Sequence, residues 1–367
     1  MAWMIGEQDR RQRQDLKPQA LQCKARRPLA HMAIDDFGLD GEDKGRGHGT
    51  FWLCGRNRER IPSRSMRNIS TASEPPMPHA NLRPRRSVLY MPGSNARALE
   101  KAASLNSDGL ILDLEDAVAP DAKAMARTQV CAAVAARGFG RREVVIRVNG
   151  LETPWFADDI RAAVAAGPDA ILVPKIASPQ DLAFVHGLLS DCGAPASLAL
   201  WAMMETPRAI FRALEIATSG GRLACLVMGT NDLVKEVHGL HTPGREAVMT
   251  ALGLSVLAAR AGGLAILDGV YNDIDDAAGF EAVCAQGRAM GFDGKTLIHP
   301  SQLETCNRVF APSPQEVAAA TKILAAFALP ENHGRGAISL DGRMVERLHA
   351  EIASRTVALA NAIAAQQ

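Results

Sequence analysis

Charged residues follow a series of apolar segments, at the point where each segment ends. The stretch LILDLEDAVAP, residues 110–120, begins as an apolar strand and ends in the acids Asp113, Glu115 and Asp116. Further polar residues at segment ends are Arg147, Asn149, Lys175, Glu205, Thr206, Asn231, Asp232 and Asp268. Carboxylates without thiolates or clustered imidazoles favour a hard cation, Mg²⁺ or Mn²⁺, over zinc.

Two of these carboxylates end neighbouring strands and are predicted to bind the ion. Glu205 and Asp232 can both reach one octahedral Mg²⁺ and leave positions open for an α-keto or α-hydroxy acid. Arg147 could bind a substrate carboxylate or stabilise an enolate oxygen. This set suits making or breaking a C–C bond beside a carbonyl. The alternative is a structural Glu205–Arg147 ion pair. His299, in IHP, is interpreted as a structural hydrogen-bonding residue.

Eight strand-and-helix units would bring these segment ends together. The expected strands, rich in Val, Ile and Leu, are 87–91, 109–115, 143–149, 170–175, 197–205, 222–229, 264–270 and 293–300. Ala-rich segments with an apolar period of about 3.6 residues lie between them and predict helices. The pattern predicts a (β/α)8 TIM barrel, whose active site lies at the carboxyl ends of the strands. A doubly wound sheet is the alternative, although the first turn, MPGSNAR, lacks the GxGxxG fingerprint.

The chain is predicted to have three segments. Residues 1–84 form a polar tail, 85–311 the barrel, and 312–367 a helical C-terminal extension. The tail has charge runs and little apolar periodicity, so we expect it to be disordered. A nucleic-acid-binding arm is an alternative use of its basic runs. The tail could also derive from an upstream start codon, with Met66 or Met77 as the functional start.

Composition narrows the class of protein. Apolar residues make up 47% of the chain and aromatics only 4%, so Ala, Val, Leu and Ile must fill a large core. A net charge of +1 gives no field that favours nucleic acid or membrane. We find no bilayer-spanning apolar stretch and no signal-peptide pattern. The seven cysteines are scattered without a CxxC pair, which indicates buried thiols in a reducing, cytoplasmic setting.

Six motifs occur in order along the barrel segment: RRSVLYMPGSNARALEKA, LDLEDAVAPDAKAMAR, VIRVNG, METPRAI, LVMGTNDL and GFDGKTLIHPSQ. They resemble the HpcH/HpaI aldolase and citrate lyase β-subunit superfamily, in particular its malyl-CoA and citramalyl-CoA lyase-like branch. The resemblance implies an Mg²⁺-dependent (β/α)8 enzyme that acts on acyl-CoA thioesters of hydroxy acids. It also implies a homo-oligomer, a trimer or hexamer.

The resemblance carries over to individual residues by motif. Glu205 of METP and Asp232 of GTNDL would be metal ligands, and Arg147 of IRVNG would bind the substrate and take part in catalysis. Glu205 and Glu115 would also contact the substrate, and Asp116 would be catalytic.

Coenzyme A is expected to bind near the first strand and helix. The resemblance assigns this contact to Arg86, Arg97 and Lys101. Arg97 and Lys101 lie four residues apart, on one helical face, which suits a phosphate contact. A solvated helix face is the alternative for these two residues.

The segment DGRMVE near the C-terminus departs from the family motif, which often reads DGKMID and forms a lid over the next subunit's site. In the lyases the closing Asp acts as general acid/base on the acetyl-CoA carbon, and here that position is Glu346. A misplacement of about 1 Å can cost about 10²-fold in rate. Glu346 is interpreted first as the proton-transfer group. A second interpretation is that the change from Asp to Glu accompanies a shift to hydrolysis or to another substrate. A third is that Glu346 is a solvated helix residue with no role. Asp341 is the nearest alternative carboxylate.

These features together predict a carbon–carbon lyase. It would cleave a malyl-, citramalyl- or citryl-CoA-type thioester to acetyl-CoA (or propionyl-CoA) and an α-keto acid. One alternative is a malyl-CoA-type thioesterase on the same metal site. The other is a non-catalytic subunit that binds CoA esters. No nucleic-acid or membrane partner is expected.

Overall fold

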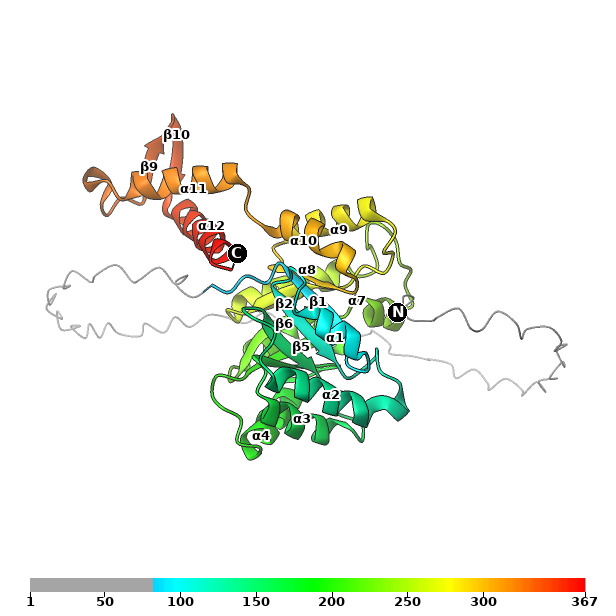
Figure 1. Ribbon diagram of the computed structural model, residues 1–367. Coiled ribbons are helices and arrows are strands. Elements are labelled where there is room, and N and C mark those ends of the chain that lie inside the picture. Colours follow the sequence, from blue (N-terminus) through cyan, green and yellow to red (C-terminus); the bar gives the residue numbers. More distant parts are fainter. Residues whose placement is uncertain (1–81, 367) are drawn as a thin grey trace, which may run out of the picture. The chain divides into compact units, whose positions relative to one another are not determined.

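Eight parallel strands form a closed barrel in the order β1 to β8, with helices on its outside (Figure 1). The structure is a computed structural model and describes residues 82–366. The strands are β1 (Ser87–Pro92), β2 (Gly109–Asp113), β3 (Glu143–Arg147), β4 (Ala170–Val173), β5 (Ala199–Met204), β6 (Leu223–Met228), β7 (Ala265–Asp268) and β8 (Gly294–Leu297). Because β8 pairs with β1, the predicted (β/α)8 barrel is confirmed and the doubly wound sheet is wrong.

The barrel strands are apolar on both faces because the interior and the helix layer bury them from opposite sides. In β2, Ile111 packs inside the barrel with Trp201 and Val227. Its neighbours Leu110 and Leu112 belong to the core between sheet and helices. The strand sequence GLILD is therefore a continuous apolar run, without the alternation of a half-exposed strand.

The two ends of the barrel interior each have an arginine beside an aromatic ring. At the amino-terminal end, Arg85 lies 5.3 Å from the ring centroid of Trp201 and binds Glu143 through bonds of 2.6 and 2.8 Å. At the carboxyl-terminal end, Arg147 lies 4.9 Å from the ring centroid of Tyr90. Such contacts are favourable because the face of the ring is electronegative.

Helices follow the strands around the barrel, and α2, α3 and α4 succeed one another along its outside (Figure 1). The barrel helices are α1 (Ala96–Ala102), α2 (Lys123–Ala135), α3 (Phe156–Ala166), α4 (Pro179–Asp191), α5 (Pro207–Phe211), α6 (Ala213–Ala217), α7 (Thr230–Glu236), α8 (Met249–Ala261), α9 (Ala277–Met290) and α10 (Leu303–Phe310). A side chain caps the start of α1, α4, α5 and α9. For example, Ser178 accepts the N–H of Asp181 ahead of α4, and Pro179 follows in the first turn.

The C-terminal extension holds a β-hairpin as well as helices. It comprises α11 (Pro314–Phe327), β9 (Ala337–Leu340), β10 (Arg343–Glu346) and α12 (Arg347–Ala364), and α11 packs along α12 (Figure 1). The two-residue turn between β9 and β10 is Asp341–Gly342, with φ values of 51° and 76°. Asp-Gly with positive φ at both positions is typical of a type I′ hairpin turn. The sequence pattern predicts the helical part of this extension but not the hairpin.

Residues 1–81 and 367 lie outside the described part of the chain, so the predicted tail is described only from residue 82. Within residues 82–366, no helix combines the length and apolarity that a membrane span requires. The cysteines in this range are free, and Cys225, Cys284 and Cys306 are buried.

Candidate active site

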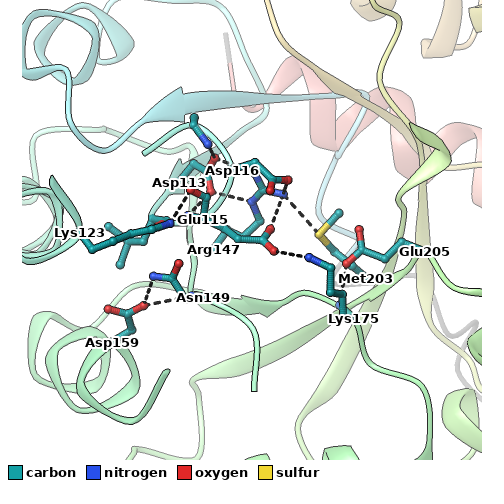
Figure 2. Close-up of polar contacts among 12 residues, drawn as sticks. Asp113, Glu115, Asp116, Lys123, Arg147, Asn149, Asp159, Lys175, Met203 and Glu205 are labelled. Atoms are coloured by element: carbon teal, nitrogen blue, oxygen red, sulfur yellow. Dashed lines mark hydrogen bonds and ion pairs between the residues drawn. The ribbon is translucent and has the colours of Figure 1, made fainter. Parts of the chain in front are cut away.

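Charged side chains from β2, β3 and the segments after β4 and β5 meet at the carboxyl ends of the strands (Figure 2). Asp113 and Arg147 are the last residues of β2 and β3 and pair with each other across the two strands. Lys175 and Glu205 follow β4 and β5 and are joined by a hydrogen bond. These four residues, which the sequence places at successive strand ends, therefore lie together in space.

Arg147 is held by the carboxylate of Asp113. Its Nε donates to Oδ1 and its Nη2 to Oδ2, both at 2.6 Å. Burial alone would raise the pKa of Asp113, but the charge and hydrogen bonds of Arg147 lower it. Arg147 thus pairs with Asp113, Glu115 and Asp116. The ion pair predicted as the alternative, between Arg147 and Glu205, is absent from the described contacts.

Glu115 lies between two cations. Its Oε2 is 2.9 Å from Arg147 Nη1, an ion pair in which the atom accepts no properly directed hydrogen bond. Its Oε1 accepts a 3.0 Å hydrogen bond from Lys175 Nζ. Burial raises the pKa of Glu115 despite the opposing charge of Arg147. The backbone of this turn is fixed by Lys123, whose buried Nζ donates to the carbonyls of Leu114 (2.8 Å) and Glu115 (2.7 Å).

Glu205 is a buried carboxylate whose environment suits a cation. Only 2% of the surface of Glu205 is exposed to solvent. Burial, and then repulsion from the Glu115 and Asp232 carboxylates, raises the pKa of Glu205 to about 8. Gly229 makes room for it, because a Cβ there would lie 2.3 Å from Glu205 Cβ. A divalent ion between Glu205 and Asp232 would relieve this repulsion, so these two residues fit Mg²⁺.

Two carboxylates, those of Glu205 and Asp232, are enough protein ligands for Mg²⁺. Within residues 82–366, no group of three or more His, Cys, Asp or Glu residues forms a ready metal site. Magnesium is commonly held by one or two carboxylates, with water and substrate completing its shell. A closed zinc-type site would instead need about four protein ligands.

Asp268 does not join this cluster, contrary to the sequence-based expectation. Its buried side chain accepts hydrogen bonds from Arg245 (2.7 and 2.8 Å) and Lys295 (3.0 Å). It also lies against Gly287 of α9, where a Cβ would be 2.9 Å from Oδ2. The side chain therefore faces the helix layer. Side chains alternate between the two faces of a strand, so a strand that ends one residue later has its last side chain on the opposite face.

The structure gives Arg86 a different role from the predicted CoA contact. Arg86 precedes β1 and so lies at the amino-terminal end of the barrel, opposite the end where Glu205 follows β5. It is buried, and its backbone N–H, Nε and Nη2 all donate to Asp108 at 2.7 to 2.8 Å. Arg97 and Lys101 are exposed on α1, which directly follows β1.

Other candidates lie in turns and helix starts. Glu346 is the N-cap of α12, where its carboxylate accepts the N–H of His349 and its own N–H donates to His349 Nδ1 at 3.0 Å. Asp341 is a hairpin-turn residue paired with Lys322. Nδ1 of His299 accepts the N–H of Ser301 (3.2 Å), which is a structural hydrogen bond.

Several supporting residues were missed from the sequence. Asp159 in the first turn of α3 accepts both the N–H (3.0 Å) and the side-chain amide (2.6 Å) of Asn149. It also accepts a 2.6 Å bond from Arg127. Its sequence context gave no signal, because an acid in a first helical turn is common for electrostatic reasons alone. Lys123, at the start of α2, was missed because the sequence does not show that its side chain reaches the carbonyls of Leu114 and Glu115.

A cavity of about 290 Å³ opens beside Glu115 and Lys175. Its walls come from the segments after β3 and β4 and from the start of α5, and they include Thr153, Ser178 and Arg208. Arg208 forms no ion pair or hydrogen bond through its side chain in the described part of the chain. The cavity therefore offers space and a positive charge next to the carboxylate cluster.

A family model described as HpcH/HpaI aldolase/citrate lyase matches residues 86–300. The chain belongs to this family. The match covers the whole strand series and all the residues of the carboxylate cluster, so the resemblance noted from the sequence motifs is confirmed.

Relatives of the chain in this family are enzymes or enzyme subunits. A (3S)-malyl-CoA thioesterase of Cereibacter sphaeroides is 51% identical over 282 residues, which cover 77% of this chain and 96% of that protein. The citrate lyase subunit beta of Escherichia coli (strain K12) is 34% identical and covers 72% of this chain and 89% of that subunit. The Mycobacterium tuberculosis protein CitE, solved with magnesium, acetoacetate and coenzyme A, matches with a TM-score of 0.62 at 29% identity, covering 76% of this chain and 100% of that chain.

These relatives correct the predicted reaction. The lyase interpretation is wrong, because the relatives at 51% identity are thioesterases, whereas the citrate lyase subunits are only 33–34% identical. The motifs used in the sequence analysis lie at strand ends and shape the barrel and its carboxylates. They do not distinguish cleavage of a C–C bond from cleavage of a C–S bond.

Proposed function

We propose that this chain is an Mg²⁺-dependent thioesterase that hydrolyses a short hydroxyacyl-CoA of the malyl-CoA type. The observation that carries the proposal is the 51% identity to (3S)-malyl-CoA thioesterases over 96% of their length. In the proposed reaction water adds to the thioester carbonyl carbon. The C–S bond then breaks, and the free hydroxy acid and the CoA thiol are released.

Glu205 and Asp232 would hold the metal ion. When bound, Mg²⁺ would supply positive charge that orients the hydroxy acid and polarises its oxygen atoms. The support for this assignment is that the buried Glu205 carboxylate is repelled by the half-buried carboxylate of Asp232, and a cation would relieve this repulsion. The M. tuberculosis relative was solved with magnesium, in agreement with this assignment.

Arg147 would stabilise negative charge on the reacting oxygen. Two of its nitrogens are occupied by Asp113, which leaves Nη1 as the end directed toward Glu115, Asp116 and Met203. A preorganised donor needs no reorientation when charge develops in the transition state. Glu115 would help to place this nitrogen and the substrate beside it.

Asp116 would accept the proton of the attacking water. Its side chain is 49% exposed and lies 3.3 Å from Arg147 Nη1, so it can be reached by water next to the proposed oxyanion site.

Arg97 and Lys101 would bind CoA phosphates, which their exposure and shared helix face permit. A homo-oligomer, trimeric or hexameric, is part of the proposal and is supported by exposed apolar residues on the extension: Met344, Leu348 and Ile352.

Thiol release from malyl-CoA tests the proposal. Purified protein should release free CoA with Mg²⁺ and lose this activity in excess EDTA. Asp232→Asn should weaken Mg²⁺ binding and lower turnover while the melting temperature of the metal-free protein stays near that of wild type. Full activity in EDTA, or unchanged Mg²⁺ affinity in the variant, would exclude the assigned metal site.

A further inference from the structure

We propose that Lys175 is a positioning residue that fixes Glu205 and Glu115 relative to each other, and that its strained backbone is retained for this purpose. The inference rests on the proposed function, because these are the carboxylates of the proposed metal and substrate site. Lys175 follows strand β4, and the family motifs assign it no role.

The backbone of Lys175 is left-handed. Its φ is 55°, although the residue has a Cβ and is neither Asn nor Asp. This conformation brings Cβ close to the following carbonyl oxygen and costs free energy, so it persists only where surrounding contacts enforce it. Such residues are found preferentially at functional sites.

The contacts that enforce this conformation reach two different strand ends. The N–H of Lys175 donates to Glu205 Oε1 at 2.6 Å, and its Nζ donates to Glu115 Oε1 at 3.0 Å. The pairing of β4 with β5 ends at Val173 and Ala202, so the Lys175 N–H lies beyond the strand ladder. One residue therefore binds a carboxylate after β5 with its amide and a carboxylate after β2 with its side chain (Figure 2).

The opposite side of Glu205 is closed by Gly229. A Cβ at Gly229 would lie 2.6 Å from Glu205 Oε2, so this carboxylate is confined between Gly229 and the Lys175 amide. Glu115 is confined in the same way between Lys175 and Arg147, whose Nη1 lies 2.9 Å from Oε2. Lys175 thus contacts both carboxylates, that of Glu205 through its N–H and that of Glu115 through its Nζ. Groups that orient metal ligands typically account for 10- to 100-fold in metal affinity or activity.

The other side of Lys175 is open. Its side chain is 51% exposed and borders the cavity of about 290 Å³. A lysine that served stability alone would gain little from an ion pair with this exposure. Stability alone would favour glycine at this position, because glycine adopts positive φ without strain. The proposed positioning role requires lysine, so a glycine variant distinguishes the two roles.

The test compares Lys175→Gly with Arg137→Gly in the full-length protein. Arg137 is a matched control, since its φ is 56° and it follows α2, at the amino-terminal end of the barrel. Both glycine variants should keep or raise the melting temperature of the metal-free protein. Lys175→Gly keeps the backbone N–H to Glu205 but removes the Nζ bond to Glu115 and the restraint that a side chain places on the backbone. It should therefore weaken Mg²⁺ affinity, measured by calorimetry, and lower kcat/KM by about tenfold or more, while Arg137→Gly should change neither. Lys175→Arg, which keeps a cationic side chain beside Glu115, should recover part of the lost activity.

Two results would overturn the inference. One is wild-type Mg²⁺ affinity and kcat/KM in Lys175→Gly. The other is a fall in the melting temperature of that variant with no such fall in Arg137→Gly, which would make Lys175 a stabilising residue only. Mg²⁺ affinity is measured without substrate, so absence of malyl-CoA hydrolysis in the wild-type protein would reject the proposed function while the positioning role is still tested.

Discussion

Arg147 and Asp113 meet edge to edge, with the Nε–Oδ1 and Nη2–Oδ2 distances both 2.6 Å. This two-bond geometry fixes the plane of the guanidinium and directs Nη1 toward Glu115 and Asp116. Two backbone N–H groups, those of Glu115 (2.9 Å) and Ala117 (3.1 Å), hold the Asp113 carboxylate in turn. The orientation of the proposed oxyanion donor is therefore set by Asp113 and by the backbone that holds its carboxylate.

Replacement of Arg147 by lysine should remove that orientation. A lysine has one point charge and cannot form the paired bonds to Asp113 while presenting a further nitrogen to the substrate. We expect Arg147→Lys to lose on the order of 10²-fold in kcat/KM, the scale of one preorganised donor. Arg161→Lys, on the exposed face of α3, is the control and should retain full activity. An Arg147→Lys enzyme within about twofold of wild type would mean that the arginine is structural only.

The stability of the metal-free protein should fall as pH rises, because of Glu205. The pKa of Glu205 is about 8 in the folded protein against an ordinary value of 4.5. Between these two values the folded state holds a proton that the unfolded state has lost, so each rise in pH favours unfolding. Above the folded pKa this loss is complete. Melting temperatures of wild type and Glu205→Gln at pH 5 and pH 8 isolate the contribution, and the variant should show the smaller fall.

Magnesium should reverse this effect. Binding requires the ionised carboxylate, so added Mg²⁺ should raise the wild-type melting temperature more at pH 8 than at pH 5. Glu205→Gln should show little response to the ion at either pH. An equal pH dependence in the two proteins, or an equal Mg²⁺ response, would assign the shifted proton and the metal to other residues.

A chain that starts at Met77 should retain its stability and activity. It keeps Arg83 and Arg85, which bind Asp169 (3.3 Å) and Glu143 (2.6 Å) at the amino-terminal end of the barrel. A start at residue 87 should be less stable, because it removes these ion pairs and the buried Arg86–Asp108 pair. Thermal melts and thiol release for both truncations check this prediction. Loss of either property in the Met77 chain would give the first 76 residues a role.

Glu346→Gln should affect the extension more than hydrolysis. The carboxylate caps the first turn of α12, so loss of its negative charge at the helix N-terminus should lower the stability of this helix. Proton transfer to a carbon atom is needed for C–C cleavage but not for attack of water on a thioester, so kcat/KM for hydrolysis should change by less than about threefold. A loss of about tenfold or more at an unchanged melting temperature would instead support the predicted proton-transfer role of Glu346.

The sequence was sufficient to predict the barrel and much of the site. Apolar runs that end in charge fix both the strands and the end at which they meet, so Arg147, Glu205 and their neighbours could be found without coordinates. Side-chain direction could not be found in this way. Asp268 ends a strand like Asp113, yet it faces α9, because the exact last residue of a strand decides the face.

Two other features depend on information that strand patterns lack. The left-handed backbone of Lys175 arises from contacts to Glu115 and Glu205, which are distant in sequence, and nothing in the local sequence VPKIA requires it. The choice between lyase and thioesterase depends on how water and the thioester are placed at a shared metal site. Motifs that define the site itself are common to both reactions.

Hydrolysis of malyl-CoA in ¹⁸O-labelled water tests the central claim most directly. Products would be separated and their masses measured after reaction with the Mg²⁺-loaded protein. Thioester hydrolysis predicts free malate with one heavy oxygen in the carboxyl group released from the thioester, together with an equal amount of free CoA. Formation of acetyl-CoA and glyoxylate, with no labelled malate, would contradict the proposed function.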